Sequence, residues 1–169
     1  IALTPSTSES YAHLFRCFCE PGERVAVPAP GYPLFEPIAR AEGLGTAPYR
    51  LVWDGDWHLD RESVERALAV ARVLVTVEPA YPTGAVLGTA DRDWLDRTCA
   101  THGVPIVADE VFRDPGTAGE SWGAGERRAL TAVLGGLSKT CGLPHLKLAW
   151  TTFAGPGDAC AEALARFAW

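Results

Sequence analysis

Apolar residues occur along the chain in two alternating patterns. Short segments rich in apolar residues are typical of strands in a sheet; they lie at 1–3, 24–27, 49–52, 72–77, 104–108, 132–137 and 146–154. Between these runs, apolar residues recur every three or four positions, as Tyr11, Leu14 and Phe15 do, which is typical of amphipathic helices. Such helices are predicted at about 9–19, 33–42, 60–70, 91–102 and from 155 onward. Strands that alternate with helices indicate an α/β protein with a mostly parallel sheet.

The length and net charge of the chain limit the kinds of partner that the protein is expected to bind. The 169 residues suit one globular domain, and 15 Lys and Arg against 21 Asp and Glu give a net charge of −6. The chain has no Lys/Arg run, and nucleic acids and anionic membranes require clustered positive charge, so we expect neither as a partner. No apolar run reaches the roughly 18 to 20 residues of a membrane span, and no leader sequence is recognisable. We therefore expect a cytoplasmic protein.

The cysteines and the first residue add two expectations. Five cysteines (Cys17, Cys19, Cys99, Cys141, Cys160) form no C-x-x-C pair and have no histidine at metal-binding spacing beside them. We therefore expect free thiols in a reducing compartment, and no metal site. The chain has no methionine and begins at Ile1 inside a predicted strand, so we expect a domain excised from a longer protein.

Polar side chains follow several predicted strands where an open α/β sheet binds its ligands. In such sheets, loops and helix N-termini converge at the carboxyl ends of the strands. The residues at these points are Ser6, Thr7 and Ser8, then Tyr32, the turn 82–84, Asp109, and the pair Ser138 and Lys139. Ordinary structural roles remain open for them: a helix N-cap for the hydroxyl cluster, a half-buried loop aromatic for Tyr32, and a cap or surface acid for Asp109.

Lys139 is the most specific of these residues. A lysine that ends an apolar strand beside a crevice is expected to be desolvated, which favours its neutral, nucleophilic form, although the side chain can instead extend to solvent. An anion cradle, a flat aromatic, a carboxylate and a nucleophilic lysine are together the parts that a pyridoxal 5′-phosphate site needs. The residues therefore predict this cofactor.

Four ordered motifs make the chain resemble the large domain of the class I/II aminotransferases, the fold type I pyridoxal phosphate enzymes. They are LTPSTSESY followed by EPGERVAVPAPGYPLF, then VEPAYPTGAVLG, IVADEVF, and LGGLSKTCGLPHLKLAW. The resemblance implies a three-layer α/β/α sandwich whose mostly parallel sheet has about seven strands, one of them antiparallel. It also implies that residues 1–169 are the cofactor-binding large domain, without the N-terminal segment and the C-terminal small domain, of a protein that is active as a homodimer.

The resemblance implies a role for each candidate residue. Lys139 would be the Schiff-base lysine, Asp109 the partner of the pyridine nitrogen, and Tyr32 the aromatic that stacks on the ring. The residues implied to hold the phosphate are Ser6, Thr7 and Ser138, with Lys147 where many relatives have an arginine. A lysine keeps the charge at that position but loses the two-pronged hydrogen bonding of arginine.

Two residues depart from the family pattern. Tyr81 stands where the family usually has the asparagine of Asn-Pro-Thr-Gly, and Phe112 stands where Asp-Glu-Val-Tyr often places a tyrosine. Both usual hydrogen-bond donors to the phenolic oxygen of the cofactor are thereby changed. Phe112 cannot donate a hydrogen bond, and Tyr81 carries its hydroxyl on a longer and rigid side chain.

The activity that the resemblance implies is transamination between an amino acid and a 2-oxo acid, with Lys139 holding the cofactor and then moving a proton as general base. A pyridoxal phosphate-dependent lyase or decarboxylase could use the same residues. A cofactor-binding regulator domain without turnover, or a decayed fragment of an enzyme, is the alternative from a different class of protein.

Overall fold

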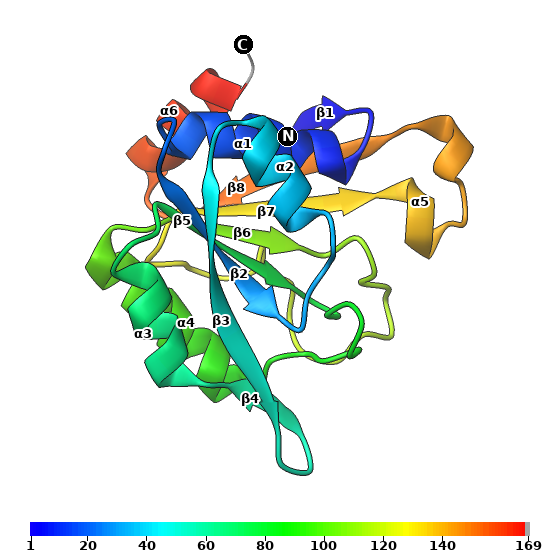
Figure 1. Ribbon diagram of the computed structural model, residues 1–169. Helices are drawn as coiled ribbons and strands as arrows, with labels where there is room; N and C mark the ends of the chain where they lie inside the picture. Colours follow the sequence, from blue (N-terminus) through cyan, green and yellow to red (C-terminus); the bar gives the residue numbers. More distant parts are fainter. Residues whose placement is uncertain (168–169) are drawn as a thin grey trace.

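Eight strands form one sheet in the order β1-β8-β7-β6-β5-β2-β3-β4 in a computed structural model that describes residues 1–167 (Figure 1). The strands are β1 (Ala2–Thr4), β2 (Arg24–Ala29), β3 (Gly45–Trp53), β4 (Trp57–Leu59), β5 (Val73–Val77), β6 (Ile106–Asp109), β7 (Thr131–Gly136) and β8 (Ala149–Ala154). The helices are α1 (Thr7–Phe18), α2 (Phe35–Ala41), α3 (Arg61–Leu68), α4 (Thr89–His102), α5 (Leu137–Thr140) and α6 (Gly157–Phe167), with a 3-10 turn η1 (Pro144–Leu146). None of these helices is long and apolar enough to cross a membrane.

The central strands β3, β2, β5, β6 and β7 pair in parallel, and β8 lies antiparallel between β7 and β1. The predicted α/β class with a mostly parallel sheet is therefore confirmed. The sheet differs in two details from the expectation of about seven strands with one antiparallel: it has eight, and both β4 and β8 run against the rest.

The eighth strand, β4, has no counterpart among the predicted strands. The chain of β3 continues to Trp53, turns at Gly55 with a φ of 115°, and returns so that Trp57 pairs with Trp53. A three-residue strand is too short to show a periodicity of its own, so the polar turn concealed it. The predicted last strand, 146–154, is also shorter, because Pro144–Leu146 form a 3-10 turn and β8 begins at Ala149.

Helices cover both faces of the sheet, as the three-layer prediction requires (Figure 1). On one face α1 and α2 cover the valines of β2 and β5, with Phe15 and Phe35 among the buried residues, and α6 packs against α1 and β8. On the other face α3 and α4 pack against Leu74 and Ile106. The central strand β5 is buried at every position, as expected for a parallel strand that is covered on both sides.

Two helices begin with side-chain caps, and the first is the N-cap that the sequence leaves open for the hydroxyl cluster. The Ser6 hydroxyl accepts a hydrogen bond from the Glu9 backbone N–H at 3.2 Å, and the Asp60 carboxylate accepts one from the Ser63 N–H at 3.1 Å. Such caps satisfy backbone donors that the first helical turn leaves free. The cap at Ser6 matters here because it fixes where α1 begins, beside the carboxyl ends of β6 and β7.

A buried hydrogen-bond network holds the polar loop that follows β6. Glu110 accepts hydrogen bonds from the Ser121 hydroxyl and the Trp122 backbone N–H, both at 2.6 Å. The Trp122 indole N–H in turn donates to Glu78 at 2.6 Å. Because Glu78 and Glu110 directly follow β5 and β6, the network anchors the loop to the end of the sheet where Phe112 emerges.

Candidate cofactor-binding site

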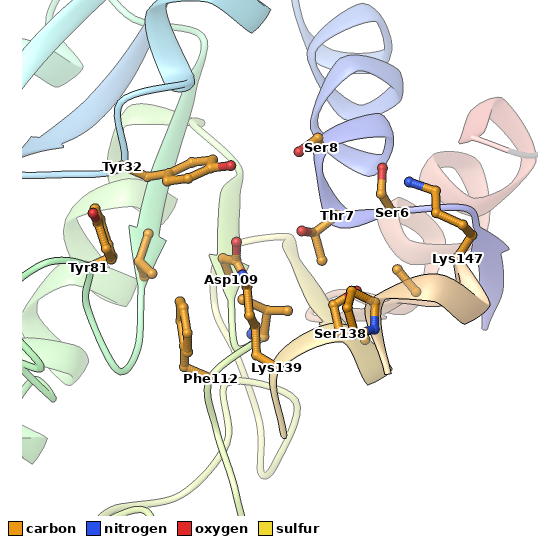
Figure 2. A pocket seen from close by; sticks show the side chains of 15 residues that line it. Ser6, Thr7, Ser8, Tyr32, Tyr81, Asp109, Phe112, Ser138, Lys139 and Lys147 are labelled. Carbon is orange, nitrogen blue, oxygen red and sulfur yellow. The ribbon is translucent and has the colours of Figure 1, made fainter. Parts of the chain in front are cut away.

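A pocket of about 430 Å³ opens at the carboxyl ends of β5, β6 and β7, beside the N-terminus of α1. Its lining contains all nine residues that the sequence predicts for the site: Ser6, Thr7, Tyr32, Tyr81, Asp109, Phe112, Ser138, Lys139 and Lys147. Ser8 and the mostly apolar floor residues Val77, Val111, Gly136, Pro144 and Ala149 complete it. Figure 2 shows the two tyrosines on one side of the pocket, the hydroxyl cluster with Lys147 on the other, and Asp109 between them.

The hydroxyl side of the pocket has the composition of an anion site. Ser6, Thr7 and Ser8 form the start of the 12-residue helix α1, whose N-terminus carries partial positive charge and unpaired N–H groups. Lys147 lies on the same side of the pocket as Ser6 (Figure 2), and its backbone takes the left-handed φ of 51° that glycine usually occupies. Ser6 is thus an N-cap and a pocket residue at once, so the two interpretations of the cluster do not exclude each other.

Asp109 lies at the floor of the pocket, 6% exposed, at the end of β6. Its Oδ2 accepts a hydrogen bond from the Tyr11 hydroxyl at 2.7 Å, and its Oδ1 accepts one from the Val111 N–H at 2.9 Å. Burial raises the pKa of Asp109 above its usual range, although the hydrogen bonds from Tyr11 and Val111 act in the opposite direction. The interpretation as a surface acid is therefore wrong: Asp109 is a buried carboxyl that faces a cavity.

Lys139 is placed differently from the expectation. It lies in the four-residue helix α5, after β7 has ended at Gly136, and its side chain is exposed. The expected desolvation of Lys139 at a strand end is therefore wrong for these residues, because a turn of helix carries it out of the sheet. Its amine lies 5.7 Å from the centre of the Phe112 ring, at the edge of the pocket. The amine is accessible to a ligand there.

Aromatic rings form the side of the pocket opposite α1. Tyr32 packs edge-on against Tyr81, with 6.1 Å between ring centres, and against buried Phe35 at 5.6 Å. Tyr81 and Phe112 remain 44% and 40% exposed. Both departures from the family pattern thus border the pocket (Figure 2). Their effect on a cofactor's phenolic oxygen stays a prediction.

Tyr11 is the functional contact that the sequence did not reveal. The helical pattern places Tyr11 on the buried face of α1, where it reads as a core aromatic, and its ring does pack 5.4 Å from that of Phe35. Its hydroxyl, however, donates to Asp109, 98 positions later in the chain. The one available signal was the phenol itself, because a buried tyrosine hydroxyl needs a partner.

Comparison with known proteins identifies the class to which this fold and pocket belong. The family model described as "Aminotransferase class I and II" matches residues 1–168. The chain is a member of that family, which is a family of pyridoxal phosphate-dependent enzymes.

The chain is similar to two curated proteins and to a solved structure that shares its fold. The mitochondrial alanine aminotransferase of Saccharomyces cerevisiae is 31% identical over 128 residues, which cover 69% of this chain and 22% of that protein. An S-alkyl-thiohydroximate lyase of Arabidopsis thaliana is 25% identical over 161 residues, covering 92% and 35%. The solved structure of a pyridoxal phosphate-bound putative aminotransferase from Clostridium difficile is 16% identical, with a TM-score of 0.83, covering 96% and 43%. The chain spans about a quarter of the length of the aminotransferases first matched among curated proteins.

The donor groups in the pocket fit the cofactor of this family. A cationic, hydroxyl-lined helix start suits a phosphate, and a buried carboxyl suits a protonated ring nitrogen. Between these two ends lie an aromatic face, from Tyr32, and a primary amine, from Lys139. Residues 1–167 contain no group of three or more His, Cys, Asp or Glu side chains arranged to hold a metal ion.

Proposed function

We propose that this chain is the pyridoxal phosphate-binding large domain of an aminotransferase that moves an amino group between an amino acid and a 2-oxo acid. The observation that carries the proposal is the joint presence, in one pocket, of the buried Asp109 carboxyl, the accessible Lys139 amine and the cationic start of α1. The family membership of the chain supports it.

Each pocket residue has a defined task under this proposal. When bound, the cofactor supplies an aldehyde that condenses with amines and an electron-withdrawing ring. Lys139 would hold the cofactor through its amine and, when its amine is free, would move a proton as a general base. Asp109 stabilises positive charge on the ring nitrogen. The phosphate is held by Ser6, Thr7, Ser138 and Lys147.

Covalent trapping tests the assignment of Lys139. Borohydride reduction of the cofactor-loaded protein, followed by peptide mapping, should place the pyridoxyl mass on Lys139. The Lys139→Ala variant should lose the adduct, whereas the matched variant Lys147→Ala should keep it and bind the cofactor more weakly. An adduct on Lys147 in the unaltered protein would overturn the assignment.

A lyase acting through the same residues is the second candidate, and the similarity to the Arabidopsis lyase over 92% of this chain favours keeping it. Incubation with an amino acid and pyruvate or 2-oxoglutarate separates the two activities. A transaminase yields a new amino acid, and a lyase yields ammonia. If neither product forms in a protein that binds the cofactor, the regulator or decayed-enzyme alternative is favoured.

We also propose that the protein acts as a homodimer whose second subunit covers the pocket. Large apolar side chains are exposed in the pocket lining, at Tyr81 and Phe112, and close in sequence to lining residues, at Leu34 and Leu146. Light scattering on the intact protein should give twice the chain mass, and an apolar-to-charged variant such as Leu146→Glu should halve it. A cytoplasmic location is proposed as well, supported by the five cysteines, which are all free within residues 1–167.

A further inference from the structure

The contact between Tyr11 and Asp109 connects helix α1, which covers one face of the sheet, to the floor of the pocket. Tyr11 is 1% exposed, and its ring packs between Phe15 and Phe35, with ring centres at 5.8 and 5.4 Å. The phenol is therefore held on both sides by aromatic rings. Its hydroxyl reaches Asp109 Oδ2 at 2.7 Å, the distance of a hydrogen bond to a carboxylate.

Tyr11 is the side chain that donates to Asp109, and the second donor is the Val111 backbone N–H. Other charged or titratable groups are arranged around the carboxyl. Glu110 is adjacent in the chain and opposes its negative charge. Tyr32, Lys139 and Lys147 line the same pocket.

We propose that Tyr11 is a positioning residue: its hydroxyl stabilises the negative charge of Asp109 and turns the free side of the carboxylate toward the pocket, where the protonated ring nitrogen of the cofactor binds. The proposal rests on the proposed function. It adds a residue to the site that lies outside the pocket lining and acts on the cofactor only through Asp109.

The physical reason is the competition between burial and hydrogen bonding at Asp109. Burial favours the neutral acid, which offers no charge to a protonated ring nitrogen, whereas a hydrogen bond to the anion favours the charged form. Tyr11 remains a donor over the working pH range, because burial and the neighbouring Asp109 raise its pKa well above its usual value. Without the Tyr11 hydroxyl, one of the hydrogen bonds that lower the pKa of Asp109 is lost, so burial should raise this pKa further.

The chain offers a matched control. Tyr49 is equally buried at 1% exposure, and its hydroxyl donates at 2.8 Å to the Val75 carbonyl, which carries no charge. Tyr11→Phe and Tyr49→Phe therefore each remove one buried hydroxyl and one hydrogen bond. They differ in the partner that is left behind, so a purely structural role predicts the same result for both.

The test measures two quantities in the intact protein. Carbon-13 NMR of labelled aspartate in the cofactor-free protein gives the titration midpoint of Asp109, and fluorescence titration with pyridoxal 5′-phosphate gives its Kd. Tyr11→Phe should raise the midpoint by about one unit, because a lost hydrogen bond to a charged group is worth at least this much. At pH values below the midpoint of the unaltered protein, it should also weaken binding about tenfold, because the charged fraction of Asp109 falls tenfold. Tyr49→Phe should change neither.

Equal values for Tyr11→Phe and Tyr49→Phe would overturn the proposal. If Tyr11→Phe does not fold, 3,5-difluorotyrosine at position 11 serves instead: it keeps the shape, donates more strongly and should lower the Asp109 midpoint, and an unmoved midpoint would overturn the proposal equally. Failure of the unaltered protein to bind pyridoxal phosphate would overturn the proposed function, while the midpoints would still decide whether Tyr11 sets the charge of Asp109.

Discussion

Asp109 is expected to reduce the stability of the fold that it serves. Its pKa is raised by burial, so the folded protein holds this proton to higher pH than the unfolded chain does. The contribution of Asp109 to stability is therefore fully present below the unfolded pKa of about 4 and is lost as the pH rises through the folded pKa. Above its folded pKa, Asp109 leaves the cofactor-free protein with a buried negative charge.

We predict that Asp109→Asn becomes more stable, relative to the unaltered cofactor-free protein, as pH rises from 4 to 8. The difference in unfolding free energy should grow by about 1.4 kcal/mol for each unit by which burial raises the pKa. Urea unfolding at several pH values measures this, and the same variant should bind pyridoxal phosphate weakly. Asp96→Asn is the control: Asp96 accepts backbone N–H bonds from Arg128 and Ala129, so its replacement should destabilise. Parallel curves for Asp109→Asn and the unaltered protein would contradict the prediction.

For single residues, the sequence indicates which side chains lie together at the end of the sheet, but not which hydrogen bonds they form. Asp109 and Lys139 are recognisable because each follows an apolar strand, and parallel strands end at one edge of the sheet. The Tyr11 contact depends on how α1 is rotated against β6, which no local pattern encodes. The sequence does not predict the exposure of Lys139 for a related reason: a four-residue helix is too short to show a helical periodicity in its sequence.

Helix α1 supports both the fold and the anion site through one residue, Ser6. Replacing an N-cap serine or aspartate by alanine costs about 1 kcal/mol of stability. We therefore expect Ser6→Ala and Asp60→Ala, which remove the caps of α1 and α3, to lower the unfolding free energy by similar amounts. Only Ser6→Ala should also weaken pyridoxal phosphate binding, by about tenfold if its hydroxyl donates to the phosphate.

Chemical denaturation and a fluorescence titration on the two cap variants measure both effects. Asp60 is a suitable control because it caps a helix on the opposite face of the sheet and is absent from the pocket lining. Unchanged cofactor affinity in Ser6→Ala would mean that Ser6 is a cap and no more.

The elements that the sequence predicts best are those that carry a recognisable apolar pattern. Strand β5 and helix α4 were recognisable because their patterns extend over enough residues. Strand β4 and the 3-10 turn at Pro144 were not, because each is a three-residue segment with a polar histidine at its centre. Their conformations depend on neighbours, Trp53 for β4 and the path of 141–148 for the turn, and not on local preference.

At the scale of the whole molecule, the pocket couples cofactor binding to stability. A ligand that binds only the folded state stabilises it by about 2.7 kcal/mol at one hundred times its Kd. We expect pyridoxal phosphate to stabilise the protein by this amount in thermal or urea unfolding. Pyridoxal, which lacks the phosphate, should stabilise it less at equal concentration, because it cannot use the start of α1. Equal stabilisation by both compounds would contradict the assigned phosphate site.

The pairing of β1 with β8 also determines when the pocket can exist. Thr4 pairs with Ala149, and β1 has β8 as its neighbour in the sheet. Ribosomes add about 5 to 20 residues per second, so β1 leaves the ribosome roughly ten seconds before the strand it needs. Ser6 and Thr7 are therefore among the first residues of this segment to be made and among the last to be fixed in place. A nascent chain can therefore expose Asp109 to the cofactor before Ser6 and Thr7 are placed to bind the phosphate. We expect stable binding of the cofactor to begin only after β8 has emerged from the ribosome.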